Sequence, residues 1–253
     1  FCQNWTISTS REFDSLSQEA SPEEIAYAAK GLGAESIAFT YNDPIIFAEY
    51  AIDAANACRE VGVRPIAVSA GYITEEPRRA LFGAMSAANI DLKGFTDEFY
   101  RKITGGRLRP VLDTLEYIRS IDCWLEITTL LIPGKNDSDE EITAMSRWIV
   151  ENLGSDVPHH FSAFHPSHRM MDVPPTPTET LKRARQIAAA EGEQYVYTGN
   201  IFDPAGQSTY CPACGAEVIG RDRYFIRSWA LNVNEDGRGH CKACGHHIPG
   251  VFA

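Results

Sequence analysis

The sequence predicts an α/β protein built on parallel strands, followed by a small metal-binding domain. Between residues 36 and 198, six short apolar runs alternate with segments of helical spacing, the pattern of successive β/α units. Polar or small residues follow these runs, at the strand ends where such folds gather their functional groups. Two CxxC pairs lie near the end of the chain. We expect an open or nearly closed β/α barrel in preference to a six-stranded doubly wound sheet.

The apolar runs and helical segments can be placed along the chain. Strands are expected at residues 36–40, 65–69, 90–93, 124–132, 160–164 and 195–198. Helices are expected at 23–30, 45–60, 75–88, 97–103, 110–120 and 139–151, with another after residue 176. Capping-box spacing starts three of these helices, at Ser21/Glu24, Ser138/Glu141 and Thr176/Glu179. Residues 6–19 are polar and are expected to form an irregular connection.

Composition excludes several functional classes. A hydrophobic fraction of 44% is ordinary for a globular core, and no apolar run is long enough to cross a bilayer. A net charge of −11 argues against general binding to nucleic acid or to anionic membranes. The seven cysteines are odd in number and include CxxC pairs, which favours metal chemistry in a reducing compartment. We therefore expect a cytoplasmic protein. The composition does not exclude a targeting segment upstream of Phe1.

The cysteine pairs near the end of the chain predict a metal site. Two such pairs can place four thiolates in a tetrahedron, the arrangement that structural Zn²⁺ sites favour. A glycine follows each pair and permits a tight turn. So short a segment needs its metal to fold. We expect a barrel domain over residues 1–205 and a zinc-ribbon-like domain over 206–253. The expected metal of the ribbon is zinc, with iron as the alternative, and its expected ligands are Cys211, Cys214, Cys241 and Cys244.

Histidines cluster at the fifth predicted strand. Four of the seven lie between residues 158 and 168, and strand alternation puts His159 on one face and His160 on the other. A mononuclear metal site here, completed by Glu126 and Asp91, would suggest a metal-dependent barrel hydrolase. No HExxH or His-x-His spacing elsewhere supports that hypothesis. By the same alternation, Asp91 and Lys93 point to one face and can share a pocket.

The first residues, Phe-Cys-Gln-Asn-Trp, place a cysteine between aromatic residues. On their own they would favour an ordinary small buried side chain at Cys2, as we expect for Cys58 and Cys123. Together with segments further along, however, they resemble the end of the CxxxCxxC loop of radical S-adenosylmethionine (SAM) enzymes. The matching segments, in the same order, are Thr-Tyr-Asn-Asp-Pro (40–44), Asp-Leu-Lys-Gly-Phe (91–95), Phe-Tyr-Arg-Lys (99–102), Ile-Pro-Gly-Lys-Asn-Asp (132–137), Ala-Phe-His-Pro (163–166), Val-Pro-Pro-Thr-Pro (173–177) and Tyr-Thr-Gly-Asn (197–200).

These segments resemble the AmmeMemoRadiSam-system radical SAM enzymes, relatives of pyruvate formate-lyase-activating enzyme. The resemblance covers nearly the whole chain, including the terminal cysteine ribbon. It implies a partial (β/α)6 barrel with a [4Fe–4S] cluster held by three cysteines, leaving one iron open for SAM. Reductive cleavage of SAM would give a 5′-deoxyadenosyl radical. The implied partners are SAM, an electron donor such as flavodoxin or ferredoxin, and a protein substrate that is activated or modified.

The resemblance also implies roles for individual residues. Cys2 would be the third cluster ligand, and Phe1 the aromatic residue beside the adenine. A departure stands at Ala70, where an Asn is common, and it weakens the case for that loop as a SAM contact. The remaining implied residues are Asn42, Asp43, Ser69 and Asn200 for cofactor binding, and Asp91, Lys93 and His165 for substrate chemistry.

Two expectations concern what the printed chain lacks. The first two cysteines of the loop and the first barrel strand are expected upstream of Phe1, so the chain as printed is not expected to bind a complete cluster or to be active. A non-enzymatic reading, in which a degenerate barrel and its zinc ribbon bind another protein, is the main alternative from a different class. The metal-dependent hydrolase remains the alternative enzyme.

Overall fold

A computed structural model confirms the α/β fold class and describes residues 2, 4–8 and 18–252. The chain divides into two compact units, and the division falls inside one strand. The first unit comprises residues 1–127 and 165–174, and the second comprises 128–164 and 175–253. Each unit is described separately below.

Six strands follow one another in chain order across the sheet. β1 (Ser36–Phe39), β2 (Arg64–Ser69) and β3 (Ala87–Asp91) pair in parallel, as do β5 (His159–Ala163) and β6 (Val196–Gly199), and β4 (Trp124–Leu131) stands between β3 and β5 in the order. A doubly wound sheet reverses its strand order at a switch point, whereas this order runs from β1 to β6 without reversal. Sequential order is the topology of a partial barrel, as the sequence predicted.

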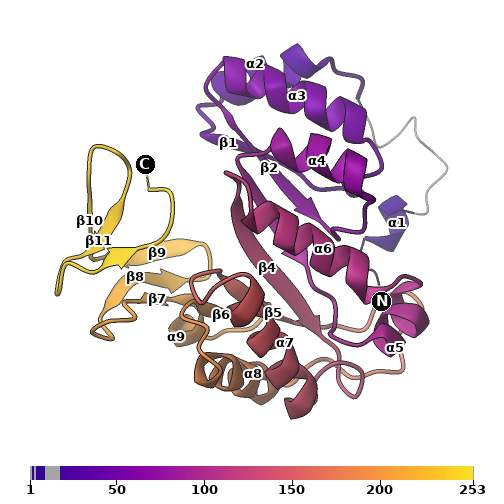
Figure 1. Cartoon of the computed structure of the whole chain (residues 1–253), viewed down its shortest axis with the longest axis vertical. Coiled ribbons are helices and arrows are strands. Elements are labelled where there is room, and N and C mark those ends of the chain that lie inside the picture. The colour runs from indigo at the N-terminus through magenta and orange to yellow at the C-terminus, as the bar shows by residue number, and fades with distance from the viewer. Residues whose placement is uncertain (1, 3, 9–17, 253) are drawn as a thin grey trace. The chain divides into compact units, whose positions relative to one another are not determined.

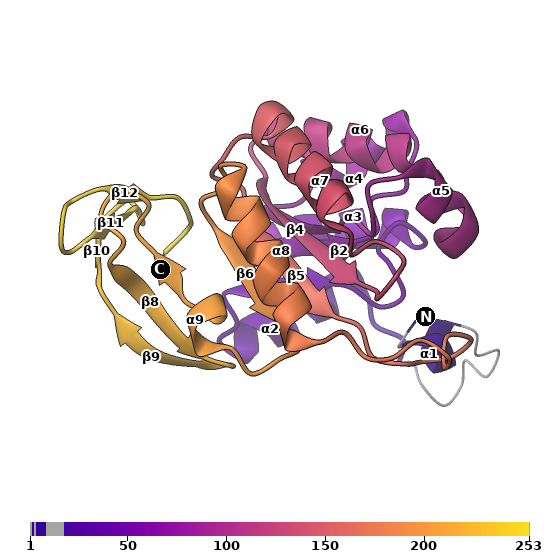
Figure 2. The ribbon, with the colours of Figure 1, turned by 90° about the horizontal axis from the view of Figure 1, so that it is seen from below.

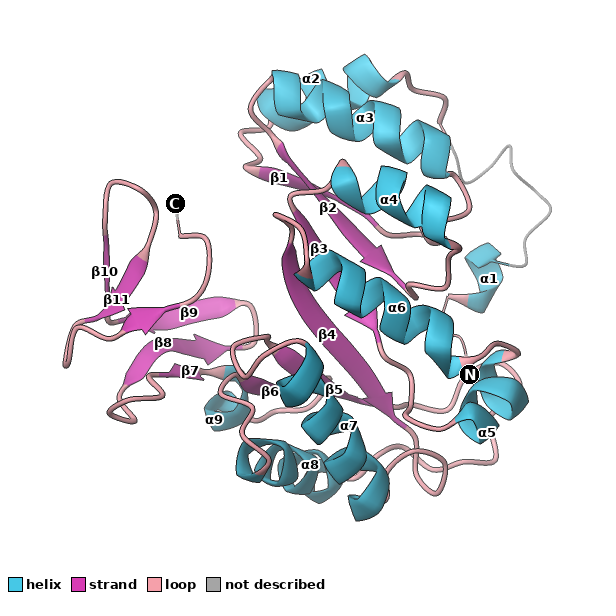
Figure 3. Cartoon of the chain, viewed as in Figure 1, coloured by secondary structure: helices cyan, strands magenta, loops and turns pink. Residues whose placement is uncertain are grey.

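In the first unit, helices cover one face of β1–β3 (Figures 1 and 3). A complete capping box at Ser21 and Glu24 starts the helix after the first connection, as predicted. The next helix buries three alanines and Cys58, small side chains that let it pack closely on its neighbours. The helices are α1 (Trp5–Ser8), α2 (Pro22–Gly31), α3 (Ala48–Glu60), α4 (Glu75–Gly83), α5 (Asp97–Phe99) with a π-turn at Tyr100–Thr104, and α6 (Leu108–Arg119).

In the second unit, α7 (Asp139–Asn152) and α8 (Thr178–Ala190) pack around Leu131 and Phe161. After α9 (Pro204–Gln207), two small antiparallel sheets form the terminal part of the chain (Figure 2). One sheet contains β7 (Thr209–Tyr210), β8 (Glu217–Asp222) and β9 (Phe225–Trp229), and the other contains β10 (Leu231–Val233), β11 (Gly239–Cys241) and β12 (His247–Ile248). None of the helices in the described part of the chain combines the length and hydropathy required to span a bilayer.

Several predicted boundaries are wrong, and for the α4–β3 junction and the start of α8 a tertiary hydrogen bond outweighs local preference. α4 ends at Gly83, and β3 begins at Ala87 because the Ser86 amide already donates to the Pro65 carbonyl 2.8 Å away. Thr176 does not cap α8, since its hydroxyl donates to the Leu131 carbonyl at 2.6 Å. α3 begins three residues later than expected, and part of the region expected to be irregular, residues 5–8, is helical.

Candidate functional site

The loops that follow β1 and β2 are joined through one carboxylate. Oδ1 of Asp43 accepts hydrogen bonds from the Ser69 hydroxyl at 2.8 Å and from the Ile45 amide at 3.1 Å. Oδ2 accepts from the Ala70 amide at 3.0 Å. Because both oxygens are occupied by the protein's own donors, Asp43 holds the two strand exits together and orients the loop between them.

The β2 exit is further constrained at Gly71. Its φ is +65°, and a Cβ added there would lie 2.9 Å from Cγ2 of Ile90, so only glycine fits. Its amide donates to the Ser69 hydroxyl at 3.0 Å, and its carbonyl accepts from the Thr114 hydroxyl at 2.7 Å. The loop therefore has a fixed backbone that a ligand could approach closely.

The exit of β3 carries an ion pair. Nζ of Lys93 lies 2.6 Å from Oδ2 of Asp91, and both side chains are partly exposed. The Lys93 amide donates to the Tyr100 hydroxyl at 3.2 Å. Burial, reinforced by the charge of Asp91, raises the pKa of Tyr100 above its usual value against the opposing effect of that hydrogen bond. The β3 exit thus presents a cation and a carboxylate, and the buried Tyr100 holds the backbone between them and α5 in place.

The first described residues contact the segment at 165–174. The Cys2 carbonyl accepts a hydrogen bond from the Ser167 hydroxyl at 3.4 Å, and the Cys2 side chain is exposed. The Trp5 ring stacks on His168, with ring centroids 5.1 Å apart. This segment therefore supports the residues on which Cys2 stands. Phe1 lies outside the described residues.

The remaining predicted site residues, Asn42, His165 and Asn200, make fewer contacts with the residues described above. Asn42 is exposed in the β1 exit loop, and His165 is exposed just after β5. Asn200 belongs to the second unit, where its φ is +60° and its side-chain amide Nδ2 donates to the Ala163 carbonyl at 3.3 Å. Asn200 therefore joins the ends of β5 and β6.

The histidines on β5 are engaged within the protein. Nδ1 of His159 lies 3.0 Å from Glu193 and Nε2 lies 2.9 Å from the Thr129 hydroxyl, with His159 and Glu193 fully buried. His160 stacks on Tyr197 at 5.0 Å. Within the described residues, no group of three or more potential metal ligands gathers at β5, which leaves the hydrolase hypothesis without support.

The two CxxC pairs do come together. The four sulfur atoms lie within 4.8 Å of one another, with 3.6 Å between Cys211 and Cys244 and 3.8 Å between Cys214 and Cys241. A tetrahedron with Zn–S bonds of about 2.3 Å has edges of about 3.8 Å, so these distances fit a bound ion. Burial alone would raise the pKa of Cys241, but backbone amide donors, chiefly that of Cys244, lower it to about 7. The cluster can hold zinc or iron.

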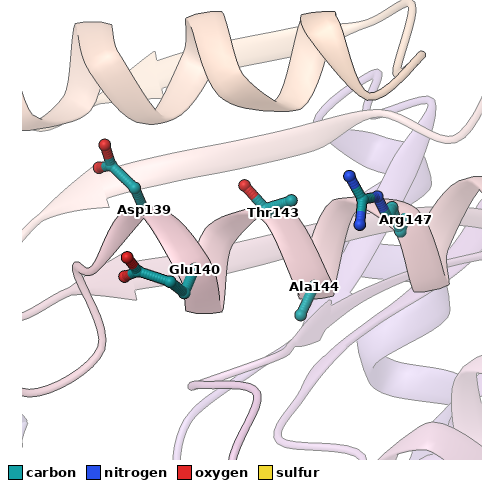
Figure 4. Close-up of a pocket in the computed structure, with 5 residues that line it drawn as sticks. All are labelled: Asp139, Glu140, Thr143, Ala144 and Arg147. Carbon is teal, nitrogen blue, oxygen red and sulfur yellow. The ribbon is translucent and has the colours of Figure 1, made fainter.

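A hollow of about 410 Å³ lies on α7 (Figure 4). Its lining residues come from one helix, and two of its three charged groups are paired: Asp139 with Arg183 at 2.9 Å, and Arg147 with Glu191 at 2.7 Å. Because all of its lining residues belong to one exposed helix face, the hollow is not closed by a second element. We assign it no role.

Sequence reasoning missed three supporting residues. Tyr100 lies in a segment quoted for the family resemblance, but its contact with Lys93 depends on the π-turn. Thr114 lies on α6 and gives no local signal of its bond to Gly71. His168, with φ +53°, follows the fifth predicted strand in the sequence, but its stacking on Trp5 depends on a contact between distant segments.

The Radical SAM superfamily model matches residues 1–145. An uncharacterized protein of Methanocaldococcus jannaschii is 39% identical over 247 residues, covering 98% of this chain and 72% of that protein. The pyruvate formate-lyase-activating enzyme of Listeria monocytogenes is 26% identical over 162 residues, covering 59% of this chain and 63% of the enzyme. The family model and the Listeria relative agree with the family that the sequence resembles.

Among solved structures, a domain of a pyruvate-formate lyase-activating enzyme from Bacteroides vulgatus has the same fold. Its TM-score is 0.55 at 18% sequence identity, and the match covers 65% of this chain and 98% of that domain.

Proposed function

This chain belongs to the radical SAM superfamily, and we propose that it cleaves SAM reductively at a [4Fe–4S] cluster and acts on a partner protein. The proposal rests on an exposed cysteine at the position where the family's cluster loop ends, supported by a contact from another segment of the same unit. The name of the Listeria relative, an activating enzyme, supports a protein substrate. A flavodoxin or ferredoxin is the proposed electron donor.

Cys2 is the residue of the described first unit that fits a cluster. Its thiol is exposed, whereas Cys58 and Cys123 are buried, and burial raises the pKa of both thiols. A cluster bound here would supply the electron that cleaves the sulfonium bond of SAM. The family's cluster takes three thiolates, of which Cys2 would be one.

The other residues of the site would position SAM and substrate. We propose that the backbone of the β1 exit, including Asn42, binds SAM while Asp43 and Ser69 keep that backbone in place. Asp91 and Lys93 would face the reacting region, where their opposite charges can bind polar groups and move a proton. We propose that Phe1 lies beside the adenine of SAM. His165 and Asn200 are proposed to lie further round the rim of the strand exits.

We also propose that the four clustered cysteines bind structural Zn²⁺, and that residues 206–253 form a ribbon domain after a radical SAM core of residues 1–205. The support is the set of sulfur distances, which suits a closed tetrahedral site. Four thiolates leave no open coordination position for a substrate, which favours a structural role.

Product analysis tests the proposed activity. The protein expressed from its full-length gene is reconstituted anaerobically with iron and sulfide, then given SAM and dithionite, and 5′-deoxyadenosine is measured by mass spectrometry. We expect product from the wild type and from Cys123→Ala, and at least about a hundredfold less from Cys2→Ala, because a missing ligand removes the cluster. A cluster-loaded wild type that makes no 5′-deoxyadenosine would refute the proposal.

A further inference from the structure

The β8–β9 hairpin exposes large apolar side chains that the proposed SAM site does not use. Tyr224 at its turn is 99% exposed, Phe225 is 78% exposed, and Ile226 and Trp229 are 58% and 41% exposed. These four residues, called the hairpin patch below, are Tyr224 at the turn and Phe225, Ile226 and Trp229 on β9. Side chains of this size are normally buried, so their concentration on one short strand marks an interaction site.

The strand that carries the patch is also at the edge of its sheet. The order β7-β8-β9 leaves β9 with β8 on one side only (Figure 2). Proteins usually protect such an edge with a free charge or a proline. The charge on β9 itself, Arg227, is instead paired with Glu217 of β8. One row of backbone groups on β9 is therefore available for a further strand.

The size of the patch favours a peptide segment over a second copy of the chain. A fully exposed large aromatic side chain offers about 200 Å², which gives the hairpin patch roughly 500–600 Å² at the observed exposures. A stable association of two folded proteins buries about 800 Å² on each partner. An extended segment of several residues, in contrast, can be held by an area of this size together with main-chain hydrogen bonds.

The charge around the patch indicates what that segment should carry. Residues 221–229 contain three arginines and one aspartate, in a chain whose net charge is −11. Arg223 stands beside Tyr224 at the turn, its guanidinium 5.7 Å from the centre of the Phe202 ring. Arg221 is bound to Thr209 and Arg227 to Glu217, so the charge that a partner meets beside the hairpin patch is that of Arg223, which favours a carboxylate on the partner.

Nucleic acid fits the surface around the hairpin patch less well than an acidic peptide does. Arg221 already donates to the Thr209 hydroxyl at 2.7 Å, and Arg227 is bound to Glu217. Nucleic-acid affinity depends on neutralising several phosphates at once, which these engaged side chains do not offer. The open strand edge is suited to a polypeptide backbone instead.

We propose that β9 and its turn bind an extended segment of a partner polypeptide that carries acidic and apolar residues and adds to the sheet as a fourth strand. The apolar side chains of the segment would cover the hairpin patch, and its carboxylates would lie near Arg223. This docking does not depend on SAM cleavage, so it can be tested in protein with no iron–sulfur cluster.

Fluorescence anisotropy with defined probes tests the docking. The probes are fluorescein-labelled 12-residue peptides of alternating Glu and Val, of alternating Lys and Val, and of Glu and Val with alternate backbone nitrogens methylated. With the full-length, zinc-loaded protein, we expect the Glu–Val peptide to bind at least about tenfold more tightly than the other two, because they lack the charge or the main-chain donors. Absence of Glu–Val binding, or equal binding of all three, would overturn the proposal.

Matched variants locate the binding. Tyr224→Ser and Ile226→Ser should each weaken Glu–Val binding about tenfold, and Arg223→Glu at least as much. Tyr27→Ser and Ile46→Ser, at residues 66% and 75% exposed in the other unit, should leave it unchanged. Unaltered zinc content and circular dichroism show that the variants fold, as expected for exposed positions.

Two further outcomes would assign the surface to another occupant and overturn the proposal. One is sedimentation showing a dimer that Ile226→Ser dissociates, which would identify a second copy. The other is a labelled twelve-nucleotide thymidine oligomer that binds more tightly than the Glu–Val peptide and is released by Arg223→Glu.

Discussion

Replacing Asp43 by asparagine should loosen the loops that follow β1 and β2. The change keeps the shape of the side chain but turns one of its two acceptor oxygens into a donor. Whichever way the amide points, a donor then faces the Ala70 amide, or faces the Ile45 amide and the Ser69 hydroxyl. Hydrogen bonds to a charged acceptor contribute about 1.5–3 kcal/mol each, so we expect local stability to fall by about 2 kcal/mol.

Amide hydrogen exchange measures this loss where it occurs. A loss of about 2 kcal/mol corresponds to exchange roughly 30 times faster, at Ala70 if the new amide faces it and at Ile45 if it is flipped. Asp53→Asn, at an exposed position on α3, is the matched control and should leave both rates unchanged. If Asp43→Asn alters neither rate by more than about threefold, Asp43 does not hold the two strand exits together.

Three other predictions concern the ribbon and the β3 exit. Cys214→Ser, or removal of the metal by a chelator, should unfold the terminal sheets while leaving the helical signal of the β/α region, as circular dichroism and metal analysis would show. Gly239→Ala should destabilise the ribbon by about 1–3 kcal/mol in urea unfolding, because the new Cβ would lie 2.6 Å from the Phe252 ring, whereas Gly31→Ala meets open space and should not destabilise. The raised pKa of Tyr100 means that the folded state keeps a proton that the unfolded state releases above about pH 10. The free energy of unfolding should therefore fall as pH rises above 10, less steeply in Tyr100→Phe.

The order and type of the main elements could be predicted from the sequence, because each β/α unit carries its own local signal. The capping box at Ser21 is one such signal, since it depends on residues three apart. The cysteine cluster could also be predicted, because CxxC spacing brings two thiolates together locally and the ribbon pairs the two turns. Alternation along β3 predicted that Asp91 and Lys93 share a face, and the structure pairs their charged groups.

What could not be predicted depends on contacts between distant segments. Thr176 has the spacing of a helix cap, yet its hydroxyl donates a hydrogen bond to the Leu131 carbonyl, 45 residues away in the chain. The resemblance implies a cofactor contact at Asp43, which stays a prediction, and only the fold shows that its oxygens accept hydrogen bonds from Ser69 and Ala70 after β2. The exposed hairpin patch gave no sequence signal, because aromatic residues in a strand normally indicate burial.

Electron paramagnetic resonance tests the central claim, that SAM binds at a cluster held by Cys2. The full-length protein is reconstituted anaerobically, reduced with dithionite, and measured with and without SAM. We expect a reduced [4Fe–4S] signal whose g-values shift when SAM is added, and a Cys2→Ala protein that gives no such signal. A cluster signal that is the same with and without SAM would contradict SAM binding at the cluster. A signal that persists unchanged in Cys2→Ala would contradict ligation by Cys2.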